Sequence, residues 1–201
     1  MSIPVYLRLK RERDIYITLR PFLREIKTAL DFQCGYSPLA PYLLMEHIGL
    51  WGFDTNHKAI RALRVQFPQA HWAECKGADY QFPCEVLDLL VWLGVSGDNG
   101  SVFSFLRIID DKDPCLILLE FSRAFSKAVR FVQRVDEHLI AHGYELQARG
   151  TTTFGFAQRF PFEHAGRVFR IYLSTQSPSC AERVAVEADD DKKPCVVNEH
   201  T

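Results

Sequence analysis

The sequence lacks any apolar run as long as the about 18 residues that a membrane-spanning helix needs. Residues 1–4 lack the charged and apolar regions that open a signal peptide. An excess of charge of one sign is also lacking, because 24 Lys and Arg are balanced by 25 Asp and Glu, for a net charge of -1. Tight non-specific binding of nucleic acid by the whole surface is therefore disfavoured. We expect a cytoplasmic protein that does not enter a membrane.

Patterns typical of metal sites are missing as well. None of the six cysteines belongs to a C-x-x-C pair, and no group of Cys and His has the spacing of a zinc site. Disulfides are rare in a reducing compartment, where buried thiols act as small apolar side chains. The sequence therefore predicts reduced, structural thiols and no metal.

The chain contains short apolar runs that alternate with amphipathic helical stretches, and its 201 residues suit one domain. The expected strands cover residues 28–32, 50–53, 70–75, 86–95, 115–121, 144–149 and 169–174. The expected helices cover residues 15–26, 38–48, 56–67, 102–109 and 125–139, with Ser37 as the N-cap of the second and Pro21 restarting the first. Strands separated by helices pair in parallel, and strands that are apolar throughout are covered on both faces.

This pattern predicts an α/β fold, a doubly wound and mostly parallel seven-stranded sheet with helices on both faces. The last two expected strands have no helix between them, so they should form a C-terminal antiparallel hairpin at the sheet edge. We expect residues 1–27 to form an N-terminal helical lid and residues 28–175 to form the α/β domain. Residues 176–201 have no apolar periodicity and are expected to form a polar, flexible tail.

Ligands of such sheets bind at the carboxyl ends of the strands, where the strand order reverses. The first strand and its turn have the sequence ALDFQCGYS, in which Asp31 closes the strand and Gly35 lies in the turn. The next strand ends at Asp54, 19 residues after Gly35. A carboxylate at a strand end can accept hydrogen bonds from both hydroxyl groups of a ribose, each worth about 1.5–3 kcal/mol. A cap on the following helix is the alternative role of Asp54.

Two further segments extend this pattern, one around Ala78 and Asp79 and one along the apolar run of residues 87–94. Together the segments resemble the class I S-adenosylmethionine-dependent methyltransferase superfamily. In that superfamily an acid closes the first strand, a turn with glycines follows, and a second acid ends the next strand. The resemblance covers roughly residues 28–174. It implies a Rossmann-like methyltransferase fold with S-adenosylmethionine as the cofactor.

The resemblance also implies the cofactor-binding residues. They are Asp31, Gln33, Cys34, Gly35, Tyr36, Asp54, Thr55, Ala78, Asp79, Trp92, Leu93 and Gly94. Asp31 would face the ammonium group of the methionine moiety, Asp54 the ribose, and Asp79 or the backbone near Ala78 the adenine. The glycine turn is divergent, because Gln33 and Ser37 stand where the superfamily usually has glycines.

A dinucleotide-binding fold is the competing interpretation, since an acid about 20 residues beyond a glycine-rich turn is part of its fingerprint. The G-x-G-x-x-G motif is absent, however, and Pro38 removes one amide that could hold a phosphate. Asp31 at the strand end would also repel a pyrophosphate. A hydride-transfer enzyme is thus a poor fit.

The methyl acceptor is less defined by the sequence. Glu120, which ends the fifth strand, is the candidate catalytic residue as a general base or substrate anchor, and a helix cap is its alternative role. The candidate substrate-binding residues are Tyr16, Phe154, Phe156 and Arg159. We expect methyl transfer to a small molecule or RNA, with a partner protein as a further option. The alternative is a protein that binds S-adenosylmethionine without methylating, as a partner subunit or by internal cyclisation or elimination of the sulfonium.

Overall fold

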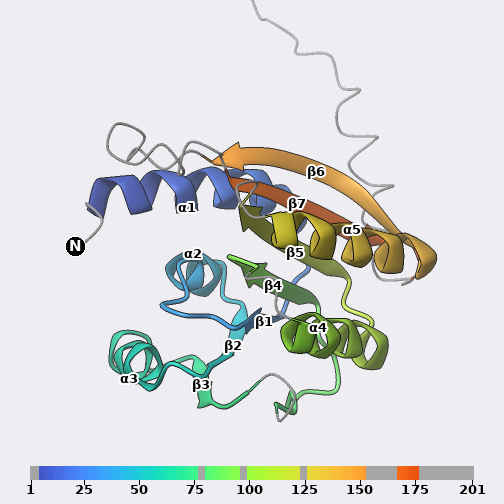
Figure 1. The fold of residues 1–201 in the computed structure, drawn as a ribbon. Helices are drawn as coiled ribbons and strands as arrows, with labels where there is room; N and C mark the ends of the chain where they lie inside the picture. The colour runs from blue at the N-terminus through green and yellow to red at the C-terminus, as the bar shows by residue number, and fades with distance from the viewer. Residues whose placement is uncertain (1–4, 77–79, 96–98, 123–125, 153–166, 177–201) are drawn as a thin grey trace, which may run out of the picture.

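The computed structural model describes residues 5–76, 80–95, 99–122, 126–152 and 167–176, and these contain seven strands in one sheet (Figure 1). The strands are β1 Thr28–Phe32, β2 Gly49–Asp54, β3 His71–Glu74, β4 Leu89–Leu93, β5 Leu116–Ser122, β6 Tyr144–Thr152 and β7 Arg167–Ser174. The helices are α1 Val5–Leu19, the short 3-10 helix η1 Arg20–Phe22, α2 Ala40–Met45, α3 His57–Gln66, α4 Asn99–Lys112 and α5 Ser126–Ala141.

The strand order is β3-β2-β1-β4-β5-β7-β6. Strands β1 to β5 pair in parallel with their neighbours, whereas β7 is antiparallel to both β5 and β6. The predicted doubly wound, mostly parallel sheet with a C-terminal antiparallel hairpin is confirmed. Strand β6 forms the edge, and β7 lies inside it.

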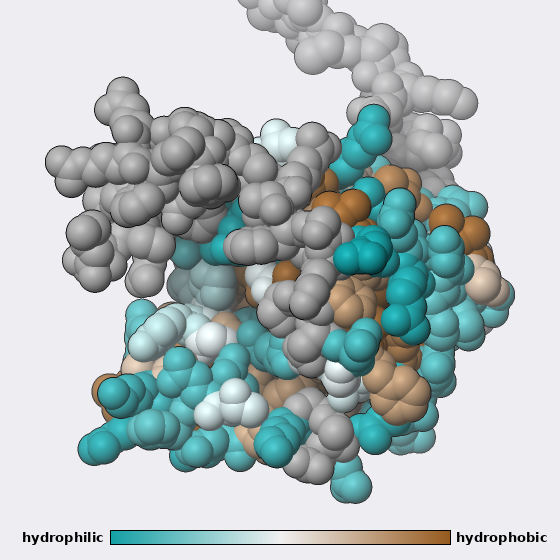
Figure 2. All heavy atoms as spheres, in the orientation of Figure 1, coloured by the Kyte–Doolittle hydropathy of each residue, from teal (hydrophilic) through white to brown (hydrophobic). Residues whose placement is uncertain are grey.

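Two apolar cores lie on opposite faces of the sheet, as the alternation of side chains along each strand requires. In β1, Ala29 belongs to one core, and Leu30 and Phe32 belong to the other. Helices α1, α2 and α3 bury residues in the core of Ala29, and helices α4 and α5 bury residues in the second core. Figure 1 shows these two groups of helices on the two sides of the sheet. In Figure 2, hydrophilic side chains cover most of the surface over α3.

The N-terminal helix begins earlier than its apolar periodicity indicated. Helix α1 ends at Leu19, and Pro21 lies in η1, so the expected restart at the proline takes the form of a 3-10 turn. Ile15, Leu19 and Ile26 are buried in the core, as predicted from their spacing. Within the described part of the chain, no helix is long and apolar enough to span a membrane.

The prediction that Ser37 caps the second helix is wrong. Helix α2 begins at Ala40, its N-cap is Leu39, and no side chain caps it. Ser37 instead donates its hydroxyl hydrogen to Asp31 Oδ2 at 2.6 Å. The buried carboxylate is the stronger acceptor, because a charge-assisted bond in the interior outweighs a cap on a helix of one and a half turns.

The prediction that the cysteines are reduced thiols is confirmed for some of them and not for all. Cys34, Cys75 and Cys84 are free thiols. Cys115 is disulfide-bonded, so the prediction of reduced thiols is wrong at this position.

Candidate functional site

The strand order reverses between β1 and β4, because the chain goes from β1 to β2 and β3 on one side and from β4 to β5 on the other. Asp31 is in register with Gly52 in β2 and with Val91 in β4. The carboxyl ends of these strands, and the turns that follow them, therefore meet at one edge. A doubly wound sheet binds its ligand in the crevice at such a point.

The turn after β1 has an alternating left-handed backbone. Gln33 has φ 51°, Gly35 has φ 51° and Ser37 has φ 43°. A left-handed conformation costs a residue other than glycine about 1–2 kcal/mol. The superfamily usually has glycines where this chain has Gln33 and Ser37. At both positions the backbone keeps the left-handed conformation that favours glycine, although the residues are not glycine.

Hydrogen bonds from three elements hold this strained turn. Gln33 Nε2 donates to Ser101 Oγ of α4. The Cys34 amide donates to the Phe53 carbonyl of β2 at 2.9 Å. Ser37 donates to Asp31 as described above. A strained backbone persists where its surroundings over-determine it, and such places are typical of ligand-binding turns.

Asp31 is a buried acid with 2% of its surface exposed, and in the described part of the chain its side chain is bonded by the Ser37 hydroxyl and by no cationic group. Burial raises its pKa from 3.8 to about 7, the nearby charge of Asp54 raises the pKa further, and the hydrogen bond from Ser37 opposes the rise. A positive group placed beside Asp31 would stabilise its ionised form. The crevice is therefore suited to a cationic ligand.

Asp54, at the end of β2, connects this strand to the turn after β1. Its Oδ2 accepts the Gly35 amide at 2.8 Å, and its Oδ1 accepts the Asn56 amide at 2.8 Å. The alternative that Asp54 caps α3 is wrong, since Asn56 is the N-cap and accepts from the Ala59 amide. Each carboxylate oxygen of Asp54 retains a further lone pair for a hydroxyl donor.

The end of β4 contributes backbone and core side chains. Trp92 is 1% exposed, and its ring lies 4.9 Å from both the Phe32 ring and the Phe105 ring. The Trp92 side chain is therefore part of the core, while Leu93 is half-buried. Gly94 has φ 80°, and its amide donates to the Glu120 carbonyl at 2.9 Å.

The Glu120 side chain is fully buried in an ion-pair cluster at the end of β5. Arg11 of α1 donates from Nε to Oε1 at 2.6 Å and from Nη2 to Oε2. Arg167 of β7 donates from Nη1 to Oε2 at 3.1 Å. Because both carboxylate oxygens are bound by guanidinium groups, the arrangement favours a positioning role for Glu120 over direct contact with an acceptor.

This cluster has no counterpart among the residues predicted from the sequence. Only 12% of the Arg11 side chain is exposed. Arg11 and Glu120 are 109 residues apart. No local pattern in the sequence signals a pairing over such a distance.

The other predicted residues lie as follows. Tyr16 donates its hydroxyl to Glu46, and its ring stacks on Tyr42 with 4.7 Å between centroids, so it joins α1 to α2. Tyr36 and Thr55 have exposed side chains. Cys34 is buried, and burial raises the pKa of its thiol, which makes it unreactive. The predictions for Ala78, Asp79, Phe154, Phe156 and Arg159 fall outside the described residues.

No family model and no curated protein matches the chain by sequence. Its structure is similar to a putative S-adenosylmethionine-dependent methyltransferase from Listeria monocytogenes, with TM-score 0.66, 8% identity and coverage of 84% of this chain and 100% of that chain. It is also similar to magnesium protoporphyrin IX methyltransferase from Synechocystis with bound S-adenosylmethionine, with TM-score 0.62, 13% identity and coverage of 87% and 86%.

The N-methyltransferase NodS from Bradyrhizobium japonicum, in complex with S-adenosylhomocysteine, has TM-score 0.61 and 15% identity, with coverage of 82% of this chain and 87% of that chain. These similarities agree with the observed strand order and with the hairpin β6–β7. The chain has the Rossmann-like fold of the class I S-adenosylmethionine-dependent methyltransferases.

Proposed function

We propose that the chain binds S-adenosylmethionine at the carboxyl ends of β1, β2 and β4 and methylates a small molecule or an RNA. The observation that carries this proposal is the placement of two carboxylates, Asp31 and Asp54, on either side of a left-handed turn in this fold. S-adenosylmethionine offers an ammonium group, a sulfonium and a ribose diol, which match two acidic acceptors. Bound there, it would supply an electrophilic methyl group.

The described residues have distinct tasks in this proposal. Asp31 stabilises the ammonium group, and Asp54 accepts the ribose hydroxyls with its remaining lone pairs. Gly94 lets the backbone approach the sulfonium side, where Leu93 supplies an apolar floor. Exposed Tyr36 extends the binding surface. The role of Asp79 or the backbone of Ala78 at the adenine stays a prediction.

The N-terminal segment would help to enclose the acceptor. Arg11 binds α1 to the carboxyl end of β5, and Tyr16 binds α1 to α2. This placement supports the expected lid of residues 1–27. Phe154, Phe156 and Arg159 stay candidates for contact with the acceptor. A pocket closed in this way would exclude water from the electrophile.

Titration calorimetry tests the cofactor. We expect micromolar affinity for S-adenosylmethionine and S-adenosylhomocysteine and no detectable binding of NAD, because the pyrophosphate would meet Asp31 and Asp54 without a basic partner in the turn. The proposal fails if neither adenosyl compound produces heat or a thermal shift.

Asp54→Ala should weaken the binding of S-adenosylmethionine by about 2 kcal/mol, roughly 30-fold, since charge-assisted bonds to the ribose are lost. Asp88→Ala is a matched control, because Asp88 also accepts backbone amides, those of Lys27 and Thr28, but at the opposite edge of the sheet. The control should lower stability and leave the affinity unchanged. If Asp54→Ala and Asp88→Ala bind S-adenosylmethionine equally well, Asp54 has a structural role only.

Product analysis separates an enzyme from a binding protein. Methyl transfer depends mainly on alignment, and a base is needed only when the acceptor must lose a proton. Both oxygens of Glu120 are held by arginines, so we expect the acceptor to be aligned without direct contact with this carboxylate. Formation of S-adenosylhomocysteine only with acceptor pools of small molecules or RNA supports a methyltransferase. Methylthioadenosine without acceptor indicates internal chemistry, and no turnover indicates a non-catalytic partner.

A further inference from the structure

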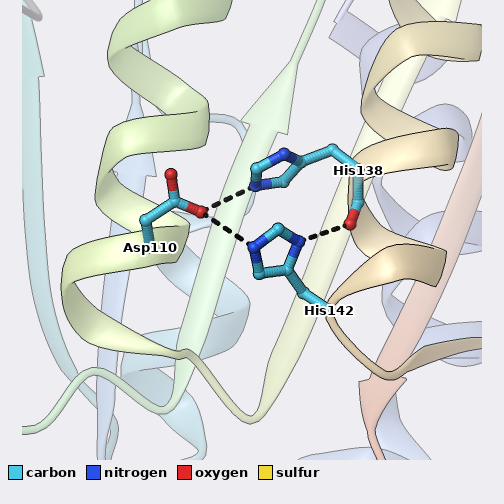
Figure 3. Close-up of side chains that lie close together, drawn as sticks. All are labelled: Asp110, His138 and His142. Atoms are coloured by element: carbon cyan, nitrogen blue, oxygen red, sulfur yellow. Dashed lines mark hydrogen bonds and ion pairs between the residues drawn. The ribbon is translucent and has the colours of Figure 1, made fainter.

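Two histidines and an aspartate converge where helices α4 and α5 pack together (Figure 3). Nε2 of His138 lies 2.7 Å from Oδ1 of Asp110, and Nε2 of His142 lies 3.6 Å from the same oxygen. The imidazole rings stack with 4.0 Å between their centroids. One potential ligand atom from each residue lies within 4.8 Å of the other two.

The tautomer of His142 is determined by its second nitrogen. Nδ1 lies 2.8 Å from the His138 carbonyl oxygen, and because a carbonyl only accepts, Nδ1 carries the hydrogen. In the neutral ring, Nε2 therefore presents a lone pair toward Asp110. A cation between this lone pair and the Asp110 carboxylate would satisfy both acceptors. A backbone carbonyl that orients a ligating imidazole in this way is common at metal sites.

We propose that Asp110, His138 and His142 form a binding site for a divalent late first-row transition-metal ion, for which Zn²⁺ is the test ion. Two imidazole nitrogens and a carboxylate oxygen are typical ligands of Zn²⁺, at distances of about 2.0–2.2 Å, with water as a fourth ligand. Ligand atoms around such an ion lie about 3.3 Å apart, and Oδ1 of Asp110 lies 2.7 Å and 3.6 Å from the two imidazole nitrogens. The hydrogen on Nε2 of His138 would move to Nδ1 when the ion binds.

The sequence contains two of the three proposed ligands in a recognisable pattern. His138 and His142 are four residues apart, so one helical face presents both, as in known zinc-binding helices. The third ligand is 28 residues from His138, on another helix. The expectation of no metal rested on Cys and His spacing alone and did not include a distant aspartate.

The position of the site indicates a structural role. Asp110 is in the last turn of α4, His138 is in the last turn of α5, and His142 directly follows that helix, so the helix dipoles favour a cation here. These helix ends precede β5 and β6, so they lie at the edge where those strands begin. The proposed cofactor crevice is at the opposite edge. A bound ion would therefore clamp α4 to α5 without taking part in methyl transfer.

Titration of the full-length, tag-free protein after treatment with EDTA tests the site. We expect one Zn²⁺ per chain and a rise in Tm of about 5–10 °C at roughly 100 times the Kd, with no response to Mg²⁺, which prefers oxygen ligands. His142→Ala and Asp110→Asn should each weaken Zn²⁺ binding by at least about tenfold. His57→Ala, which changes an exposed histidine of α3, should leave binding unchanged.

The visible spectrum of the Co²⁺-loaded protein distinguishes this site from the free thiols. Nitrogen and oxygen ligation gives d–d bands without a thiolate charge-transfer band, and His142→Ala should abolish these bands. The proposal is overturned if the wild type binds Zn²⁺ no more tightly than His142→Ala does. A Co²⁺ spectrum dominated by thiolate ligation would overturn it as well.

Discussion

Replacement of Glu120 by alanine should lower the free energy of unfolding by about 3–5 kcal/mol, the cost of breaking a buried ion-pair cluster by removing its carboxylate. Glu120 is completely buried, whereas the Arg11 and Arg167 side chains are 12% and 31% exposed. Without the carboxylate, the two guanidinium groups would lose the acceptor that they share. The loss should also loosen α1 around Arg11, although Ile15 and Leu19 keep the end of this helix in the core.

Urea unfolding of matched variants checks this expectation. Glu120→Gln retains the volume and one acceptor oxygen, so its loss should be smaller than that of Glu120→Ala. Glu145→Gln is the control, because Glu145 is exposed on β6, and its effect should stay within about 0.5 kcal/mol. A loss for Glu120→Ala no larger than the control would mean that the cluster does not stabilise the fold.

Asp31→Asn should stabilise the protein above pH 7 and at the same time weaken the binding of S-adenosylmethionine. Burial raises the pKa of Asp31 from 3.8 to about 7, so the folded state holds this proton more tightly than the unfolded state. The contribution of Asp31 to stability is therefore complete below pH 3.8 and is lost as the pH rises to about 7. The loss amounts to about 4 kcal/mol, at 1.36 kcal/mol for each pKa unit.

The amide variant has no proton to lose and keeps an oxygen that can accept the Ser37 hydroxyl. The stability difference between variant and wild type should therefore grow with a slope of about 1.4 kcal/mol for each pH unit between pH 4 and pH 7. Urea unfolding across this range measures the slope. A difference that does not depend on pH would show that Asp31 titrates normally.

The same carboxylate connects pH to the proposed function. An ammonium group beside Asp31 would favour its ionised form, so binding of S-adenosylmethionine below pH 7 should release a proton. Calorimetry in buffers of different ionisation enthalpy detects this proton. Asp31→Asn should abolish this proton release and weaken the binding of S-adenosylmethionine. The variant would then gain stability because a charge needed for function has been removed.

The sequence predicted the elements whose apolar pattern is complete. Strand β1 was expected at residues 28–32 and is found there, because both of its faces are buried and a turn closes it. Strand β6 was expected to end at residue 149 but continues to Thr152, since its exposed face lacks an apolar signal. Helix α4 begins at Asn99, three residues before its apolar stripe.

The candidate site was predictable as far as it is local. Asp31, Gly35 and Asp54 lie together as expected, because parallel strands bring their carboxyl ends to one edge. The contacts of Ser37 and Arg11 were not predictable. Ser37 has the local preferences of a helix cap but bonds a buried acid instead, and Arg11 finds its partner across the fold.

The position of β7 has a consequence for biosynthesis. Among the strands that the structure describes, β7 is the last to be translated, yet it lies between β5 and β6. Until residues 167–174 leave the ribosome, β6 has no neighbour, and the apolar strand LILLEFS of β5 has an open edge. Open apolar edges promote aggregation of nascent chains. Ribosomes that pause before Arg167 would therefore expose a chain in need of chaperone protection.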